Sequence, residues 1–217
     1  MFDHVTVRVS DRGESERFYD AVLRELGISR SGSGEQFAEW GDFWLCPATR
    51  SQPVTRRLHV AFVSPSQAHV EAFWRAGTSA GYMDDGGPGP RPRYGDDYFG
   101  GFLRDPDGIS VEAVHHGHLR QGGVVDHVWM RVSDLAGSKQ FYETVAPQAG
   151  YRLAAERDDR VRFTGSSGEF SIVAGRPTEG LQMAFPVGSD GQVAALVDPD
   201  GNRVELVCSP AGEAALE

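Results

Sequence analysis

The sequence is poor in cysteine, in clustered positive charge and in long apolar runs, and each shortage argues against a class of protein. Its two cysteines, Cys46 and Cys208, are too few for a disulfide framework, so we expect reduced thiols and a cytoplasmic protein. No apolar run approaches the roughly 20 residues of a transmembrane helix, and the N-terminus has no basic-then-apolar signal segment. Because the net charge is −10 and Lys and Arg form no long run, a nucleic-acid backbone would be repelled.

The rest of the composition is that of a soluble globular protein. Hydrophobic residues make up 40% of the 217 residues and charged residues 24%, which gives no reason to expect disorder. This length suits one large domain or two domains of about 100 residues each.

An internal repeat decides between these possibilities. Asp3-His4-Val5 returns as Asp126-His127-Val128, an offset of 123 positions, and two further blocks keep this offset. They are Phe18-Tyr19, which returns as Phe141-Tyr142, and Leu58–Phe62, which returns as Leu181–Phe185. We therefore predict a duplicated domain, with one copy at residues 1–118 and the other at residues 124–209.

The second copy is shorter than the first. The turn Asp105–Gly108, with Glu112 behind it, returns at Asp198–Gly201, an offset of only 93 positions. The second copy has thus lost 30 residues (123 − 93), and the missing stretch includes the helix that we expect over Ser66–Gly81 in the first copy.

Each copy of the repeat divides into half-units with a βαβββ plan. In the first half-unit an alternating strand from His4 to Val9 precedes an N-cap at Ser10-Asp11 and a helix with an apolar stripe. The second half-unit repeats the plan from His59, with a Gly- and Pro-rich loop after its helix. Further strands are expected at residues 36–40, 43–46, 98–103 and 109–114. The predicted class is α+β, with tandem half-units that form cupped mixed sheets.

Three side chains within these strands are candidate metal ligands. His4 and His59 open the two half-units of the first copy, and Glu112 lies among apolar residues in its last strand. A lone histidine is more often packed or hydrogen-bonded, and an arginine partner would explain Glu112 alone. If the half-units pair side by side, however, the three residues converge and form a ligand set with open positions for water and substrate.

The same motifs resemble the vicinal oxygen chelate superfamily. The resemblance rests on His4, Phe18-Tyr19, His59 and the Asp105–Gly108 turn before Glu112, and it extends over nearly the whole chain. It implies that His4, His59 and Glu112 hold one divalent metal ion (Fe, Mn, Ni or Zn) and that a substrate with adjacent oxygen atoms completes the coordination. The equivalent residues His127, Gln182 and Glu205 are expected to form a degenerate second site.

Departures from known members limit the choice of reaction. Glyoxalase I, in this resemblance, has a fourth carboxylate ligand where this chain carries Trp44 and Cys46, although Glu39 on the next strand is a possible substitute. The Trp44–Cys46 strand and Thr6 are similar to fosfomycin-modifying enzymes, but the Ser-rich potassium loop of those enzymes is missing. The candidates for proton transfer are Tyr98, Glu39 and Cys46.

Other residues are candidates for substrate contact. The loop Gly86–Arg93 either forms a lid, with Arg91 or Arg93 binding an anionic group, or is a plain surface connection. Trp44 and Phe102, together with Thr6, are expected to line the cleft.

The resulting functional expectation is a metal-dependent enzyme that acts on a small molecule, with glyoxalase-like lyase, isomerase or transferase chemistry. The alternatives are an extradiol-type ring-cleaving dioxygenase and a bleomycin-resistance-like protein that sequesters an antibiotic. Half-units of this kind pair within one chain or between two chains, so a homodimer is also compatible with the pattern.

Overall fold

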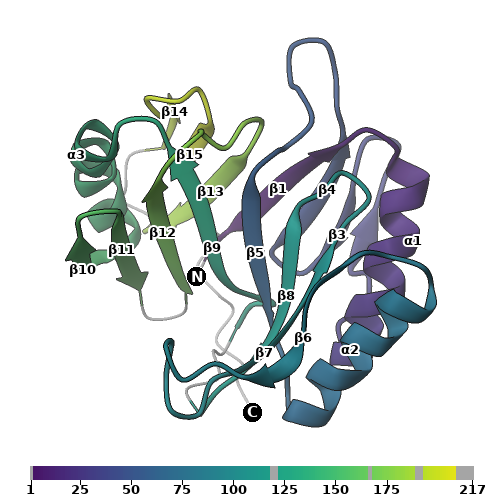
Figure 1. Ribbon diagram of the computed structural model, residues 1–217. Coiled ribbons are helices and arrows are strands. Elements are labelled where there is room, and N and C mark those ends of the chain that lie inside the picture. Colours follow the sequence, from purple (N-terminus) through teal and green to yellow (C-terminus); the bar gives the residue numbers. More distant parts are fainter. Residues whose placement is uncertain (1, 118–121, 166–167, 189–192, 209–217) are drawn as a thin grey trace, which may run out of the picture.

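The fold is described from a computed structural model, which describes residues 2–117, 122–165, 168–188 and 193–208. Its described residues form two mixed β-sheets of seven and eight strands, with helices on their outer faces (Figure 1). The predicted α+β class is confirmed. None of the described helices is long and apolar enough to cross a membrane.

The first copy of the repeat contains two half-units with the predicted order of elements. The first half-unit comprises β1 (His4–Val9), α1 (Arg12–Leu23), β2 (Gly32–Ser33), β3 (Ala38–Trp40) and β4 (Phe43–Pro47). The second comprises β5 (Leu58–Val63), α2 (Gln67–Ser79), β6 (Asp84–Pro90), β7 (Phe99–Arg104) and β8 (Ser110–His115).

The second copy contains one full half-unit and one shortened half-unit. The full one comprises β9 (Val125–Val132), α3 (Leu135–Val145), β10 (Arg152–Arg157), β11 (Arg160–Gly165) and β12 (Gly168–Ala174). The shortened one comprises β13 (Gln182–Val187), β14 (Ala194–Val197) and β15 (Arg203–Cys208). Only residues 188–193 separate β13 from β14, so the predicted loss of a helix is confirmed, and Val197 on β14 is 63% exposed.

Local sequence explains where the helices begin and end. The Asp11 side chain accepts a hydrogen bond from the Glu14 backbone N–H at the start of α1, and Ser66 does the same for His69 at the start of α2. After α1 a short 3₁₀ turn (Arg24–Leu26) ends at Gly27, which has a left-handed φ of 76°.

The prediction of a loop at the Gly- and Pro-rich segment is wrong. Residues 84–90 form β6, which lies at the edge of the larger sheet and pairs with β7 through two register shifts. Proline is tolerated there because an edge strand has backbone N–H groups that need no partner in the sheet. The segment is therefore an edge strand and does not form a free lid.

The two sheets combine half-units crosswise from the two copies. In the larger sheet β5 pairs antiparallel with β9, which joins the second half-unit to the third. In the smaller sheet β1 pairs antiparallel with β13, which joins the first to the fourth. Each copy thus contributes strands to both sheets, whereas the expected end residues of the copies, 118 and 209, lie outside the described residues.

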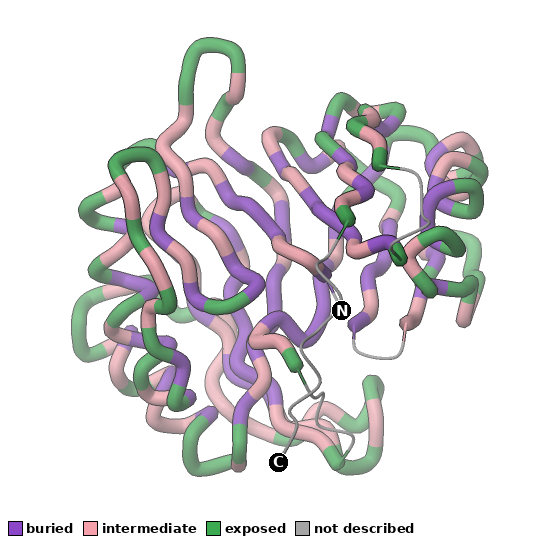
Figure 2. Tube along the Cα trace, turned by 180° about the vertical axis from the view of Figure 1, so that it is seen from behind, coloured by how far each residue is buried: buried purple, intermediate pink, exposed green. Residues whose placement is uncertain are grey.

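Contacts between the sheets tie each copy together. The buried Tyr19 hydroxyl on α1 donates to Asp105 in the turn before β8 at 3.1 Å, and Tyr142 donates to Asp198 in the equivalent place at 3.0 Å. Around Tyr19, the rings of Phe43 and Phe62 pack at 4.8 and 6.4 Å between centroids. Figure 2 shows the buried residues concentrated on the strands, with exposed residues on loops and outer helix turns.

The Tyr–Asp contacts give a prediction for stability. Replacing Tyr19 or Tyr142 by Phe removes a buried hydrogen bond, so the free energy of unfolding in urea should fall by about 1–3 kcal/mol in each variant. The control is Tyr94→Phe, because Tyr94 is 37% exposed and should change stability little. If Tyr19→Phe and Tyr142→Phe were as stable as this control, the contacts would contribute nothing to the joining of the sheets.

Candidate metal centre

The register of the larger sheet brings three potential ligands to one place. His127 on β9 lies directly opposite Ala61 on β5, and Ala61 lies directly opposite Glu112 on β8. His59 stands two residues before Ala61 and therefore points to the same face of the sheet. Since Ala61 has a small side chain, the longer side chains on either side of it can meet above it.

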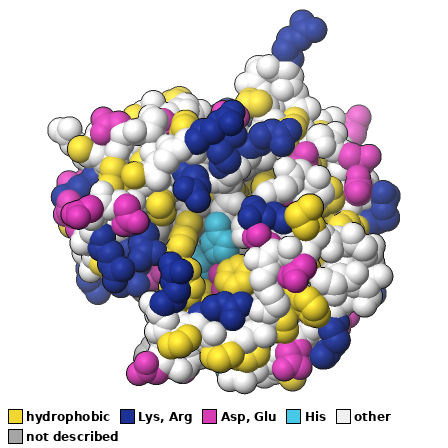
Figure 3. Space-filling view, viewed as in Figure 1, with side chains coloured by type: hydrophobic (Ala, Val, Ile, Leu, Met, Phe, Trp, Pro, Cys, Tyr) yellow, Lys and Arg dark blue, Asp and Glu magenta, His cyan; other side chains and the backbone are white. Residues whose placement is uncertain are grey.

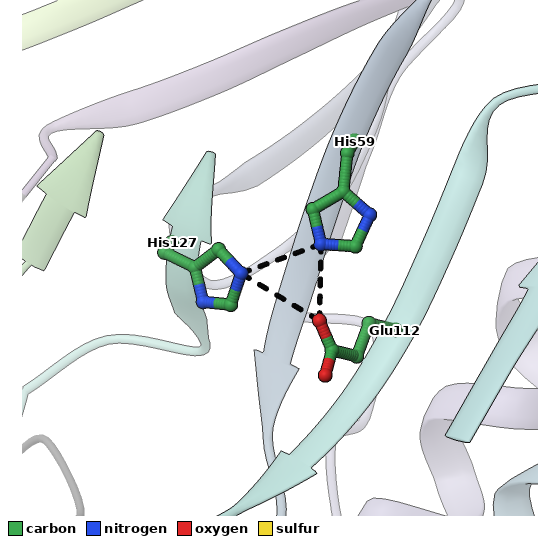
Figure 4. A group of neighbouring side chains, drawn as sticks. All are labelled: His59, Glu112 and His127. Carbon is green, nitrogen blue, oxygen red and sulfur yellow. Dashed lines mark hydrogen bonds and ion pairs between the residues drawn. The ribbon is translucent and has the colours of Figure 1, made fainter. Parts of the chain in front are cut away.

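The three side chains direct their polar atoms at one another, as Figure 4 shows. The distance from His59 Nε2 to Glu112 Oε2 is 3.0 Å, and that from His59 Nε2 to His127 Nε2 is 3.3 Å. His127 Nε2 lies 3.6 Å from Glu112 Oε2. Glu112 and His127 are buried, with 1% and 3% of their surface exposed, while His59 reaches the cavity wall.

Hydrogen bonds on the far side of each imidazole fix its tautomer. The Ser110 hydroxyl donates to Asp85 at 2.7 Å and so accepts from Nδ1–H of His59 at 3.1 Å. Nδ1–H of His127 donates to Asp126 at 2.8 Å. In the neutral form of each ring the proton therefore lies on Nδ1, and Nε2 presents a lone pair to the centre, as in most metal-binding histidines.

The Glu112 carboxylate is oriented in a similar way. Its Oε1 accepts a hydrogen bond from the Tyr98 hydroxyl at 2.8 Å, which leaves Oε2 for the two imidazoles. Gly100 on β7 makes room for it, since a Cβ at this position would lie 2.4 Å from Oε1.

Burial and charge shift the pKa values in this cluster. Burial lowers the pKa of His59, and Glu112 offsets this only in part. Burial also acts to lower the pKa of His127, but the hydrogen bond to Asp126 and the surrounding carboxylates outweigh it and raise that pKa. Burial, and then the charge of Glu112, raise the pKa of Tyr98, so its phenol keeps its proton at neutral pH.

The arrangement fits a divalent metal ion. Three potential ligand atoms converge here, and a divalent cation would take the place of the protons that these contacts share in the metal-free protein. Their separations of 3.0–3.6 Å are close to the roughly 3.0–3.4 Å between neighbouring ligands of a metal with bonds of about 2.1 Å. His59 and Glu112 border a cavity of about 370 Å³ whose walls include Tyr94, Tyr98, Phe102 and Trp129.

His4 is not part of this centre, and the expectation that it joins His59 and Glu112 is wrong. It lies on β1 in the smaller sheet, where its ring stacks on Trp44 at 4.4 Å and its Nδ1 contacts Asp3 at 2.9 Å. The physical reason is the crosswise pairing, which places β9 next to β5 in the position that we expected β1 to take.

Four other predicted site residues also lie in the smaller sheet. Thr6 is on β1, Glu39 on β3, and Trp44 and Cys46 on β4. Glu39 contacts Ser31 at 3.4 Å, and burial raises the pKa of Cys46. The structure thus separates these residues from His59 and Glu112.

The remaining predicted residues lie at the candidate centre. The Tyr98 hydroxyl donates a hydrogen bond to Glu112, and Phe102 on β7 is the direct cross-strand neighbour of Glu112. Arg93 borders a second, adjoining cavity that reaches His127, and its guanidinium lies over the Tyr94 ring at 4.7 Å.

The smaller sheet repeats the backbone arrangement but not the ligand set. His4 lies opposite Ala184, and Ala184 opposite Glu205, as His127, Ala61 and Glu112 do in the larger sheet. Gln182 stands where His59 would be and accepts a hydrogen bond from Arg8 at 3.2 Å, while Glu205 pairs with Arg203 at 3.0 Å. Among the described residues, the one three-ligand group of His, Cys, Asp or Glu is His59, Glu112 and His127.

Sequence reasoning placed His127 in the second site and did not select Asp126 or Ser110. His127 could have been found from the repeat, because it lies 123 positions after His4. Either histidine could be the neighbour of His59 until the pairing of the half-units is known. Asp126 shares that signal, because it precedes His127 as Asp3 precedes His4.

The close approach at Gly100 gives a second prediction. Gly100→Ala should displace the Glu112 carboxylate and lower the free energy of unfolding by about 1–3 kcal/mol in urea denaturation, because it overpacks the site. Gly87→Ala on β6 is the control, since its Cβ would meet nothing within 4 Å. Equal stability of the two variants would argue against a tightly fitted carboxylate.

Comparison with known proteins identifies the fold. A scan against protein-family models finds no match, and neither does a search of curated proteins. Among solved structures, glyoxalase I from Zea mays is 18% identical with a TM-score of 0.62, and the match covers 95% of this chain and 92% of that chain. A putative dioxygenase from Bacillus subtilis is 14% identical with a TM-score of 0.64, over 97% of this chain and 86% of that chain.

A third structure is more similar in sequence over a shorter stretch. A glyoxalase/bleomycin resistance protein from Albidiferax ferrireducens is 32% identical, over 54% of this chain and 98% of that chain, with a TM-score of 0.47. The fold assignment rests on the two matches that span both copies of the repeat. The chain therefore has the fold of the vicinal oxygen chelate superfamily.

Proposed function

We propose that this protein is a metal-dependent enzyme in which His59, Glu112 and His127 hold one divalent cation and a small molecule binds through two adjacent oxygen atoms. The observation that carries the proposal is the meeting of three potential ligand atoms, 3.0–3.6 Å apart, at the wall of a cavity. When bound, the metal would supply a Lewis acid that polarises the two oxygens and stabilises negative charge on them.

The donor set limits which metal is expected. Two neutral imidazoles and one carboxylate suit Fe, Mn, Ni or Zn, whereas Mg²⁺ and Ca²⁺ prefer oxygen ligands alone. Ser110 and Asp126 would orient the two imidazoles, and such supporting groups usually contribute strongly to metal affinity.

Tyr98 is the residue that we assign to proton transfer. It keeps its proton at the phenolic oxygen, beside Glu112 and at the cavity wall, where a bound molecule would meet it. Glu39 and Cys46 lie in the other sheet and do not line this cavity. Phe102 and Trp129 give the same cavity aromatic walls.

A pure sequestering protein is the less favoured candidate. Sequestration of a ligand requires a cavity, but it does not require a buried Glu112 in contact with His59 and His127. A buried carboxylate needs compensating charge, and Glu112 Oε2 lies beside two imidazole Nε2 atoms with which it can share a cation.

Metal analysis of the purified protein tests the proposal. The wild type should bind about one equivalent of metal per chain, and His127→Ala and Glu112→Gln should bind almost none, because each removes one of three ligands. His4→Ala is the matched control, since His4 occupies the equivalent strand position in the other sheet, and it should keep the metal.

Two results would contradict this assignment. Loss of metal in His4→Ala with retention in His127→Ala would place the site in the smaller sheet. Absence of metal from the wild type, even after incubation with each of the four ions, would leave sequestration as the better account.

Ring-cleaving dioxygenation is a second candidate. Two histidines and one carboxylate are the ligand set of non-haem iron(II) oxygenases, and the cavity has aromatic walls with Tyr98 beside the ligands. In that case the iron-loaded protein should consume O2 with a catechol, measured with an oxygen electrode.

The contribution of Tyr98 can be measured in the same assay. Tyr98→Phe should lower the rate by about 10²–10⁴-fold, because a proton donor is lost, whereas Tyr94→Phe on the same wall should not. An iron-loaded protein that consumes no O2 with any catechol would return the assignment to Lewis-acid chemistry without O2.

A further inference from the structure

Positive charge is concentrated around the candidate metal centre of an otherwise acidic protein. Asp and Glu outnumber Lys and Arg by 31 to 21 over the whole chain. Two adjoining cavities have more arginines than acidic residues in their walls. One is the cavity beside His59, with Glu112 as its acidic residue, and the other is a cavity of about 280 Å³ beside His127, with Glu169. Their arginines are Arg57, Arg104 and Arg131 in the first cavity and Arg93, Arg157, Arg160 and Arg162 in the second. Figure 3 shows Lys and Arg side chains around a hollow in which a histidine is visible.

The register of the sheet places several of these charges against one another. Arg157 on β10 lies directly opposite Arg160 on β11, and Arg162 follows two residues later on the same face. Across the sheet, Arg160 lies opposite Val173, which itself lies opposite Arg131. Like charges in directly opposed positions destabilise a sheet, and an anion bound between them would relieve the repulsion.

Among the described residues, the arginines of the second cavity have one carboxylate partner, Glu169. In the part of the chain that the structure describes, Arg93, Arg157 and Arg160 form no ion pair, and Arg162 has one long contact of 3.9 Å with Glu169. By contrast, Arg30, which follows the 3₁₀ turn after α1, pairs with both Glu16 and Asp20. The second cavity therefore offers guanidinium N–H groups that are free to bind a ligand.

Aromatic rings hold two of these guanidinium groups in place. Arg160 lies over the Trp129 ring at 4.9 Å, and Arg93 over the Tyr94 ring at 4.7 Å. Stacking fixes the plane of a guanidinium and leaves its N–H groups available at the edge. Trp129 and Tyr94 line both cavities, so a molecule bound at the metal centre would continue directly into the second one.

We propose that the second cavity binds a dianionic, phosphate-like group of the substrate through Arg93, Arg157, Arg160 and Arg162. This inference rests on the proposed function only for the position of the reacting end of the substrate. A phosphate monoester carries nearly two charges and three acceptor oxygens, which matches several converging guanidinium forks. A single carboxylate has one charge and two oxygens, and it would leave most of the repulsion between the arginines in place.

Phosphate binding to the metal-free protein tests this site independently of the metal. After removal of metal with a chelator, inorganic phosphate should bind in isothermal titration calorimetry. Arg157→Gln and Arg160→Gln should each weaken this binding by about 10- to 100-fold, the loss expected for a charged hydrogen bond. Arg152→Gln is the control, because Arg152 lies on the same strand, β10, but does not line the cavity.

The outcomes separate this proposal from the proposed function. Phosphate binding that depends on Arg157 and Arg160 supports the anion site even if metal analysis fails, and the proposed function would then fall alone. No binding of phosphate, equal weakening in Arg152→Gln, or equally tight binding of acetate would overturn the anion site. An unchanged urea midpoint in each variant shows that weaker binding does not come from unfolding.

Discussion

The antiparallel pairing of β5 with β9 is the contact on which the candidate centre depends. It joins a strand of the first copy to a strand of the second, and its register sets His127 opposite Ala61 and His59 opposite Trp129. A shift by one residue would turn His127 away from the cup and put Asp126 or Val128 in its place. The parallel pairing of β5 with β8 then adds Glu112 on the other side of Ala61.

The same register organises the surroundings of the centre. Asp126 precedes His127 on β9, so the strand that supplies the imidazole also supplies the carboxylate that orients it. Ser110 lies directly opposite His59 and does the equivalent for that ring. The row that begins with Arg157 and Arg160 reaches β9 at Arg131, which brings positive charge to the rim. The alignment of these strands therefore positions the candidate ligands, the groups that orient them and the arginines beside the cavity.

The elements could be predicted from sequence because their signals are local. The stripe of Phe18 and Val22 and the cap at Asp11 specify α1 without any knowledge of the rest of the chain. The pairing of the half-units could not be predicted, because strands such as His4–Val9 and Leu58–Val63 alternate in the same way and bury the same kind of face. What accompanies the observed pairing is long-range packing, such as the Tyr19–Asp105 contact between the sheets. The two predicted ligands His59 and Glu112 do lie together, whereas the histidine beside them is His127 of the second copy and not His4.

Each of the two sheets forms one cup, and the crosswise pairing of half-units allows the residues of the two cups to differ. In a symmetric dimer of one repeat copy, both cups would be built from identical residues, so any substitution would alter both at once. Joining the copies in one chain removes this restriction, since His59 and Gln182 occupy equivalent positions in separate cups and can change independently. The chain can therefore keep the candidate ligands in one cup, while in the other Arg8 donates to Gln182 and Arg203 pairs with Glu205. Duplication followed by divergence thus leaves the candidate ligands in one cup, while the matching residues of the other cup contact arginines.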